Sequence, residues 1–177
     1  MMSEYTNIDV EIPEGVQATV TDSTVVVTGP KGKITRDFAH TRLIISMTGN
    51  VISISAPQKG KRLKALVGTV AAHIKNMFKG VTIGHIYKMK VIYAHFPITV
   101  KVAGKTVFIE NFMGERSKRL ATIVGNVKVS VQGDELILEG MDKEEIGQTA
   151  ANIHGAAHVK KMDPRVFQDG VYVSGRA

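Results

Sequence analysis

Apolar and polar residues alternate through much of the first part of the chain. Residues 17–21 and 24–28 follow this pattern, are rich in valine and threonine, and flank Asp22-Ser23. Because successive side chains of a strand point to opposite faces, the pattern predicts a β-hairpin with one apolar face. Residues 33–38 resume the pattern after a Gly-Pro turn and predict a further strand.

A second hairpin is predicted a short distance along the chain. Residues 43–47 and 51–55 alternate on either side of Gly49-Asn50, a dipeptide suited to a turn that needs positive φ. Pro57 then ends the strand pattern.

From residue 59 the apolar period changes to three and four. This spacing places the apolar residues on one face of an α-helix, which we expect to end at Gly80. The helix would pack on the sheet and complete a small α+β unit. Its apolar face consists of Leu63, Leu66, Val67, Val70, Ile74 and Met77.

The same pattern then repeats. Ile12-Pro13 is matched by Phe96-Pro97, and Gly49-Asn50 between strands is matched by Gly133-Asp134. A duplication is the simplest account, and chance similarity among hairpins is the alternative. The repeated elements are a hairpin at 98–110, strands at 128–132 and 135–140, and a helix from 143 to about 158.

The second predicted helix differs in chemistry from the first. Asp142, Glu144 and Glu145 stand at its start, where carboxylates favour the positive end of the helix dipole. Ile146, Ala150, Ile153 and Ala157 share one face. We expect the buried face to be built from small residues that let the helix approach the sheet closely, namely Gly147, Ala150, Ala151, Gly155, Ala156 and Ala157.

These patterns predict an α+β protein of two tandem duplicated units. Each unit is expected to be an antiparallel β-sheet packed against one α-helix, with residues 1–81 in the first unit and 82–177 in the second. The tail after the second helix carries many hydrogen-bonding side chains and spaced apolar residues. We expect it to be ordered.

The charge distribution indicates a polyanionic partner. The formal net charge is +7 and the pI is about 9.6, which fits a nucleic acid or an anionic membrane surface. Residues 38–109 hold eleven Lys and Arg residues and no Asp or Glu. There is no cysteine, no apolar run of the roughly 18 residues that a membrane helix needs, and no signal-peptide pattern at Met1. We therefore expect a cytoplasmic protein without a membrane partner.

Three groups of residues could suggest ligand binding or catalysis, and each has a simpler interpretation. The basic turn at 29–32 lacks the spacing of a nucleotide-binding loop. His154 and His158 lack the further ligands of a zinc site, and Glu110 and Glu115 stand without any other sign of a substrate cleft. We expect neither an enzyme nor a bound cofactor or metal.

Five stretches spread along the chain resemble one known family, the large-subunit ribosomal protein called L-six, in its archaeal form. Its two tandem sheet-plus-helix units agree with the duplication. The stretches are NMFKGVT at 76–82, YKMKVIYAHFP at 87–97, IENFMGE at 109–115, GQTAANI at 147–153 and RVFQDGVYV at 165–173.

The resemblance implies a non-catalytic protein bound to large-subunit ribosomal RNA. It implies a position near the sarcin–ricin loop and the site of the translational GTPase factors, a role in subunit assembly, and neighbouring large-subunit proteins as partners. The bacterial form has a Lys/Gly-rich tail in place of residues 163–170, so its tail contacts do not carry over to this chain.

The resemblance further implies that the second unit makes the main RNA contacts. Lys61, Arg62 and Lys64 lie off the apolar face of the first helix and are additional candidates. In the second unit the candidates are Lys88, Lys90, His95, Asn111, Arg116, Lys118, Arg119, Lys160, Lys161, Arg165, Gln168 and Tyr172.

We expect these cations to neutralise phosphates while the folded shape of the RNA provides the specificity. Two other classes remain open at this point. One is a free-standing RNA-binding module or RNA chaperone outside the ribosome, and the other is an enzyme acting on RNA through Glu110 or Glu115.

Overall fold

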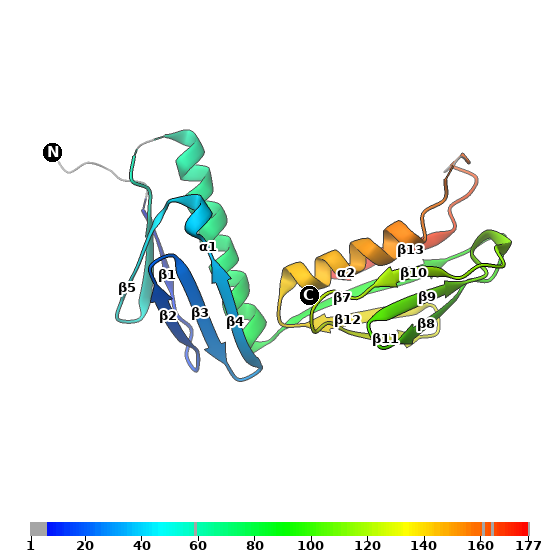
Figure 1. The fold of residues 1–177 in the computed structure, drawn as a ribbon, viewed down its shortest axis with the longest axis horizontal. Helices are drawn as coiled ribbons and strands as arrows, with labels where there is room; N and C mark the ends of the chain where they lie inside the picture. The colour runs from blue at the N-terminus through cyan, green and yellow to red at the C-terminus, as the bar shows by residue number, and fades with distance from the viewer. Residues whose placement is uncertain (1–6, 59, 161, 164, 177) are drawn as a thin grey trace. The chain divides into compact units, whose positions relative to one another are not determined.

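The computed structural model describes residues 7–58, 60–160, 162–163 and 165–176. The chain divides into two compact units, Met1–Gly84 (unit 1) and His85–Ala177 (unit 2), and each combines antiparallel strands with one helix (Figure 1). The predicted α+β class is therefore confirmed. Among the described residues, no helix is both long enough and apolar enough to span a membrane.

The described residues of unit 1 form six strands and one long helix. The elements are β1 (Asn7–Glu11), β2 (Gln17–Thr21), β3 (Thr24–Gly29), β4 (Gly32–Asp37), the 3₁₀ helix η1 (Ala39–Thr41), β5 (Ile44–Thr48), β6 (Val51–Ser55) and α1 (Lys61–Thr82). The strands form two antiparallel sheets, in the orders β2-β3-β4 and β1-β6-β5, where the sequence pattern predicted one sheet. Both predicted hairpins, β2/β3 and β5/β6, are present.

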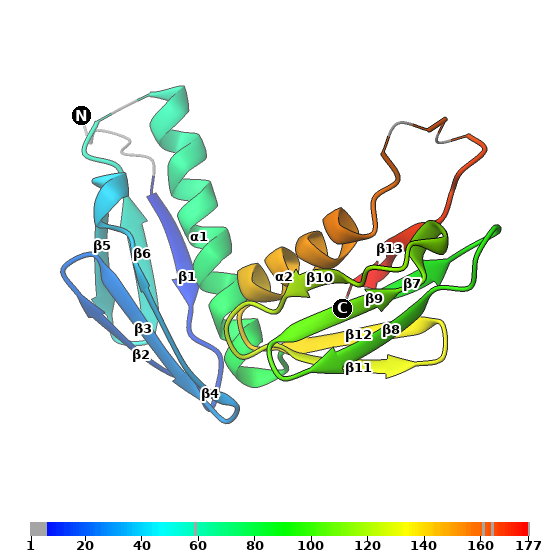
Figure 2. The same ribbon diagram turned by 45° about the vertical axis from the view of Figure 1, so that its right-hand side comes forward.

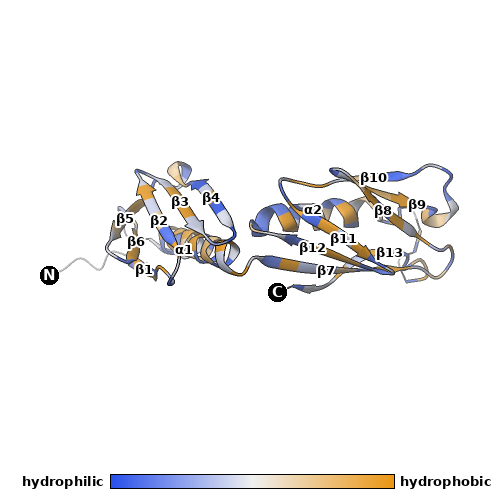
Figure 3. Cartoon of the chain, turned by 90° about the horizontal axis from the view of Figure 1, so that it is seen from below, coloured by the Kyte–Doolittle hydropathy of each residue, from blue (hydrophilic) through white to orange (hydrophobic). Residues whose placement is uncertain are grey.

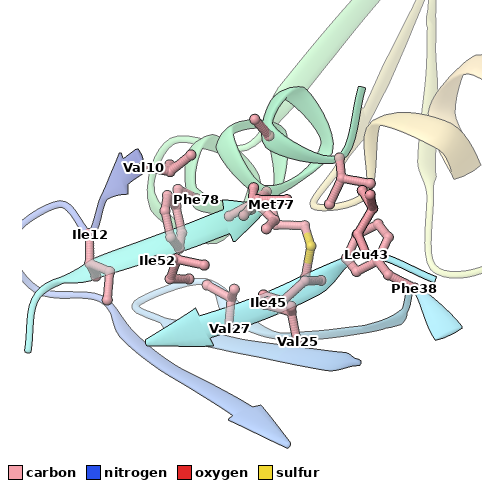
Figure 4. Packing of buried hydrophobic residues seen from close by; sticks show 14 of the residues in the cluster. Val10, Ile12, Val25, Val27, Phe38, Leu43, Ile45, Ile52, Met77 and Phe78 are labelled. Carbon is pink, nitrogen blue, oxygen red and sulfur yellow. The ribbon is translucent and has the colours of Figure 1, made fainter. Parts of the chain in front are cut away.

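Helix α1 closes the apolar interior of unit 1, as the close view in Figure 4 shows. Of the residues predicted on its apolar face, Leu63 and Leu66 are only partly buried because they lie in its first two turns. The fully buried positions are Val67, Val70, Ala71, Ile74, Met77, Phe78 and Val81.

The prediction that Gly80 ends helix α1 is wrong. Gly80 is buried inside the last turn, and the helix continues to Thr82. The backbone N–H groups of Ile83 and Gly84 both donate to the carbonyl oxygen of Lys79 at 2.9 Å. Gly84 has a φ of 84°, so the left-handed glycine that terminates the helix stands here.

In unit 2, the part of the chain that the structure describes forms seven strands and a shorter helix. The elements are β7 (His85–Ile92), β8 (Thr99–Ala103), β9 (Thr106–Glu110), the 3₁₀ helix η2 (Phe112–Gly114), β10 (Arg119–Thr122), β11 (Lys128–Gln132), β12 (Glu135–Gly140), α2 (Lys143–Ala156) and β13 (Gly170–Arg176). The sheets have the orders β10-β9-β8 and β11-β12-β7-β13. The hairpins β8/β9 and β11/β12 match the prediction, whereas the pairing of β7 with β13 was not anticipated from the sequence.

The two units repeat one strand order. The sheet β2-β3-β4 corresponds to β8-β9-β10, and β1-β6-β5 corresponds to β7-β12-β11. Unit 2 adds β13 at the edge of β7. The strands of both units show alternating hydrophilic and hydrophobic bands in Figure 3, as expected when one face of each strand meets the core. The observed topology thus agrees with the duplication inferred from the sequence.

Helix α2 buries a narrower face than predicted. Ile146, Ala150, Ile153 and Ala157 are buried as expected, together with Thr149. Ala151 and Gly155 are exposed, so the prediction that they belong to the buried face is wrong. Ala151 and Gly155 lie on the side of the helix away from Ile146, so the prediction was wrong because it grouped residues by their small size and not by their position around the helix.

Candidate nucleic-acid interface

Three loops of unit 2 meet at one end of that unit. They are the β7–β8 loop (93–98), the η2 loop (111–118) and the tail loop (157–169). In Figures 1 and 2 the η2 loop and the tail loop lie at the same end of unit 2. The side-chain amide of Asn111 donates to the carbonyl oxygen of Pro97 at 3.0 Å, which joins the first two loops.

Arg119 joins the η2 loop to the tail loop. Its guanidinium donates to both carboxylate oxygens of Glu115, at 2.8 and 2.6 Å, and to the carbonyl oxygens of Ala156 and His158, at 3.0 and 3.1 Å. It also lies 4.1 Å from the ring centroid of the buried Phe112. The hydrogen bond from Arg119 lowers the pKa of Glu115. These contacts leave little of the Arg119 guanidinium available to an RNA phosphate.

His95 joins the β7–β8 loop to the tail loop. Its Nδ1 lies 2.7 Å from a carboxylate oxygen of Asp169, and its ring stacks on Phe167 with 4.7 Å between centroids. Asp169 is only 1% exposed and also accepts from the backbone N–H groups of Ala94 and His95. Burial alone would raise the pKa of Asp169, but these hydrogen bonds outweigh it and lower the pKa.

The η2 loop has a constrained backbone that the sequence did not reveal. Asn111 and Met113 have positive φ, at 58° and 52°. Gly114 also has positive φ, and a Cβ there would lie 3.2 Å from the ring of Phe96. Asparagine and glycine tolerate this conformation best, so these positions set the loop's shape. Asn111, a predicted RNA contact, therefore has an intramolecular role as well.

The three joined loops display several exposed cations. Arg116, Lys160 and Arg165 are exposed, and their side chains have no hydrogen bond or ion pair to any other described residue. Lys118 pairs with Glu110 at 2.7 Å, and Lys101 pairs with the same carboxylate at 2.8 Å. The hydrogen bonds from Lys101 and Lys118 lower the pKa of Glu110 to about 2, so that group stays ionised beside two lysines.

Two predicted lysines lie on the strand that leads into this end. Lys88 and Lys90 are on the exposed face of β7, where Tyr172 of β13 stands opposite Lys90. The ring of Tyr172 lies 5.3 Å from that of His154, and His154 Nδ1 is 2.8 Å from the carbonyl oxygen of Val171. The ring of Tyr172 thus contacts the side chain of His154 within the unit, whereas the side chains of Lys88 and Lys90 are exposed.

The remaining candidates fall into three places. Gln168 is exposed in the tail loop, with its amide 3.4 Å from the carbonyl oxygen of Arg165. Lys161 lies outside the described residues. Lys61, Arg62 and Lys64 are exposed in the first turn of α1 and form a separate group in unit 1.

Sequence reasoning missed several partners of the residues that hold the loops together. Asp169 and Phe167 were not candidates, although each contacts His95, and Lys101 was not a candidate, although it shares the Glu110 carboxylate with Lys118. The tail holds two acids among its cations, Asp163 and Asp169, and nothing in the sequence distinguished Asp169 from Asp163. Glu110 and Glu115, considered as a catalytic pair, are each bonded to cations of the same loops.

Comparison with known proteins identifies the family. The family model described as Ribosomal protein L6 matches residues 12–84 and 96–170. The "Large ribosomal subunit protein uL6" of Methanocella arvoryzae is 49% identical over 170 residues, which cover 96% of each chain. The protein of the same name from Desulfurococcus amylolyticus is 52% identical over 167 residues, covering 93% of this chain and 91% of that protein. With both repeats matched and relatives this similar over nearly the whole length, the chain belongs to the ribosomal protein L6 family.

Proposed function

We propose that the chain is a structural protein of the large ribosomal subunit, which binds large-subunit ribosomal RNA mainly through unit 2. The family membership and the names of the relatives support this role. The chain acts on the ribosome in the cytoplasm, contacts neighbouring ribosomal proteins there, and catalyses no reaction.

One observation carries the proposed interface: three loops of unit 2 are joined by specific contacts and display outward-facing cations. Arg119 and the His95–Asp169 pair hold the loops, while Arg116 and Arg165 remain exposed. A rigid set of cations loses little conformational entropy when it meets a rigid arrangement of phosphates. Such a surface recognises the shape of a folded RNA rather than its base sequence.

The predicted contact residues divide into two roles under this proposal. The cations that contact phosphates are Lys88, Lys90, Arg116, Lys118, Lys160, Lys161 and Arg165. Arg119, His95 and Asn111 position the loops, and Gln168 and Tyr172 supply polar contacts at their margin. Lys61, Arg62 and Lys64 of unit 1 form a second, independent contact.

On the large subunit, we place the chain near the sarcin–ricin loop and the site of the translational GTPase factors, where it supports subunit assembly. This placement rests on the resemblance of the five sequence stretches to the family. Chemical footprinting of large-subunit RNA, with and without the chain, tests it. If the chain protects only RNA away from the sarcin–ricin loop, the proposed position on the subunit is wrong. The RNA interface of unit 2 is a separate proposal and has its own test.

The interface itself is tested by removing its free cations. Arg116→Ala with Arg165→Ala should weaken binding to the cognate RNA fragment roughly tenfold at moderate salt and flatten the salt dependence by about 1.4–1.8 log units per log unit of salt. The matched control is Lys105→Ala with Lys128→Ala, which removes the same charge from exposed positions outside the joined loops.

Binding to large-subunit RNA fragments, with transfer RNA as competitor across a salt series, is the measurement. Equal losses in the two double variants would show that only net charge matters, as expected of a free-standing RNA chaperone. A larger loss at the joined loops supports the proposed interface.

A further inference from the structure

The equivalent edge strands of the two units differ in one respect. In unit 2, β7 pairs with β12 on one side and with β13 on the other. In unit 1, β1 pairs with β6 on one side, and no described strand pairs with its other side. The duplicated fold therefore has a strand position that is filled in unit 2 and, within the described part of the chain, unfilled in unit 1.

The register of the two sheets shows which residues are equivalent. The turns Gly49-Asn50 and Gly133-Asp134 precede β6 and β12, so the first residues of these strands correspond. Glu11 stands opposite the first residue of β6, and Lys90 stands opposite the first residue of β12. It follows that Glu11 corresponds to Lys90. Two residues back along each strand, Asp9 corresponds to Lys88.

The backbone of β1 presents hydrogen-bonding groups at this unfilled edge. The N–H of Ile12 donates to the carbonyl oxygen of Asn50 at 2.9 Å, which makes this a hydrogen-bonded pair of the ladder with β6. Because such pairs alternate along antiparallel strands, Ile8 and Val10 face β6, while Asp9 and Glu11 direct their backbone groups outward. Among the described residues, none accepts from or donates to these outward groups.

The charges at the two edges are opposite. Lys88 and Lys90 are exposed on β7, and Asp9 and Glu11 are exposed at the same places on β1. Asp9 accepts a hydrogen bond from Ser53 at 2.7 Å, which leaves its negative charge in place. A cationic face fits phosphates, whereas this anionic edge would repel them.

We propose that the open edge of β1 is a docking site for an extended, basic segment of another protein, which adds to the sheet as an antiparallel strand. Its backbone would pair with the outward groups of Asp9 and Glu11, as β13 pairs with β7. Lysine or arginine side chains opposite Asp9 and Glu11 would complement their charges. This inference does not depend on the RNA interface of unit 2.

Two other occupants fit less well. RNA would place phosphates beside two carboxylates. A second copy of this chain, pairing β1 with β1, would set Asp9 and Glu11 of one copy beside the same acids of the other, and like charges on neighbouring strands are unfavourable. A basic polypeptide satisfies both the backbone and the charges.

The test uses the full chain and a synthetic peptide of alternating lysine and valine, followed by NMR. Amide hydrogen exchange at Asp9 and Glu11 should slow when the peptide is added, whereas Ile8 and Val10 should be protected from the outset because their N–H groups already bond to β6. The control peptide has the same side chains but carries N-methyl groups at alternate residues, so one of its edges cannot donate. It should bind less tightly.

Asp9→Lys with Glu11→Lys should weaken binding of the lysine–valine peptide roughly tenfold. Asp9→Asn with Glu11→Gln removes both charges without reversing them and should give a smaller loss of affinity for the peptide. This variant keeps the test valid if the charge-reversed variant does not fold. Unchanged exchange at Asp9 and Glu11 in the saturated wild-type chain would overturn the proposal. So would protection of these amides that rises with protein concentration in the absence of peptide, since this would assign the edge to a second copy.

Discussion

Helices α1 and α2 occupy equivalent places beside their sheets, yet they begin with opposite charges. Helix α1 starts after Gly60, whose residue type offers no capping side chain, and continues with the cations of 61–64. Helix α2 starts after Asp142, whose carboxylate accepts the N–H of Glu144 at 2.8 Å. Cations are unfavourable at the positive end of a helix dipole. Unit 1 therefore keeps its basic turn against a local electrostatic cost.

The interiors show where the compensating stability arises. Helix α1 has 22 residues and buries large side chains such as Ile74, Met77 and Phe78. Helix α2 has 14 residues and buries two large side chains, Ile146 and Ile153, beside the smaller Thr149 and Ala150. Burial of larger apolar side chains contributes more free energy of folding. We infer that unit 1 relies mainly on its core, whereas unit 2 relies additionally on contacts between its loops.

The largest expected effect is on the core of unit 1. Val70→Asp places an unpaired charge at a position that is 1% exposed, and should destabilise unit 1 by about 4 kcal/mol or more. Amide NMR signals of unit 1 should collapse while those of unit 2 persist. Ala72→Asp, at an exposed position of the same helix, is the control. Retained stability in Val70→Asp would mean that the assigned helix face is wrong.

The next effect concerns the loops of unit 2. Arg119→Ala removes hydrogen bonds to Glu115 and to two backbone carbonyl groups, and should lower the free energy of unfolding of unit 2 by about 2 kcal/mol. Arg116→Ala, at an exposed neighbouring position, should change it by less than about 0.5 kcal/mol. Denaturant unfolding measures both. Similar small effects would show that Arg119 does not hold the loops.

A smaller effect should depend on pH. The pKa of Asp169 is lowered in the folded state, so its contribution to stability is fully present above its unfolded value of about 3.9 and is lost as pH falls through the lower folded value. Asp169→Asn should reduce the stability of unit 2 at neutral pH and make its acid dependence shallower. Glu110 and Glu115, whose pKa values are also lowered, contribute to the slope that remains in this variant.

Urea unfolding between about pH 2.5 and 6 compares the Asp169→Asn variant with the wild type. Parallel stability curves in the two proteins would show that the Asp169 carboxylate does not couple protonation to the loop contacts.

The smallest expected changes in stability come from substitutions at the N-cap residues of the two helices. Asp142→Ala should cost about 1 kcal/mol, because the N–H of Glu144 loses its partner. Gly60→Asp should stabilise unit 1 by roughly 0.5 kcal/mol, since a new carboxylate would cap α1 and offset its cations. An added Cβ at Gly60 meets no atom within 4 Å. Thermal unfolding of both variants tests whether the caps explain the difference between the helices.

The amino-acid sequence by itself determined the elements whose signals are local. Alternation located the hairpins β2/β3, β5/β6 and β11/β12, and the three–four spacing located both helices to within a few residues. The repeated turns revealed the duplication, and five stretches identified the family. These signals succeed because a strand or helix places each side chain on a face that its own period predicts.

The tertiary structure decided what depends on partners distant in the chain. Spacing could not show that β13 would pair with β7, that Asp169 would hold His95, or that Arg119 would turn inward while Arg116 remained exposed. Adjacent cations look alike in a sequence. Which of them is available to RNA, and which side of β1 has no partner strand among the described residues, follows from contacts between segments that only the folded chain brings together.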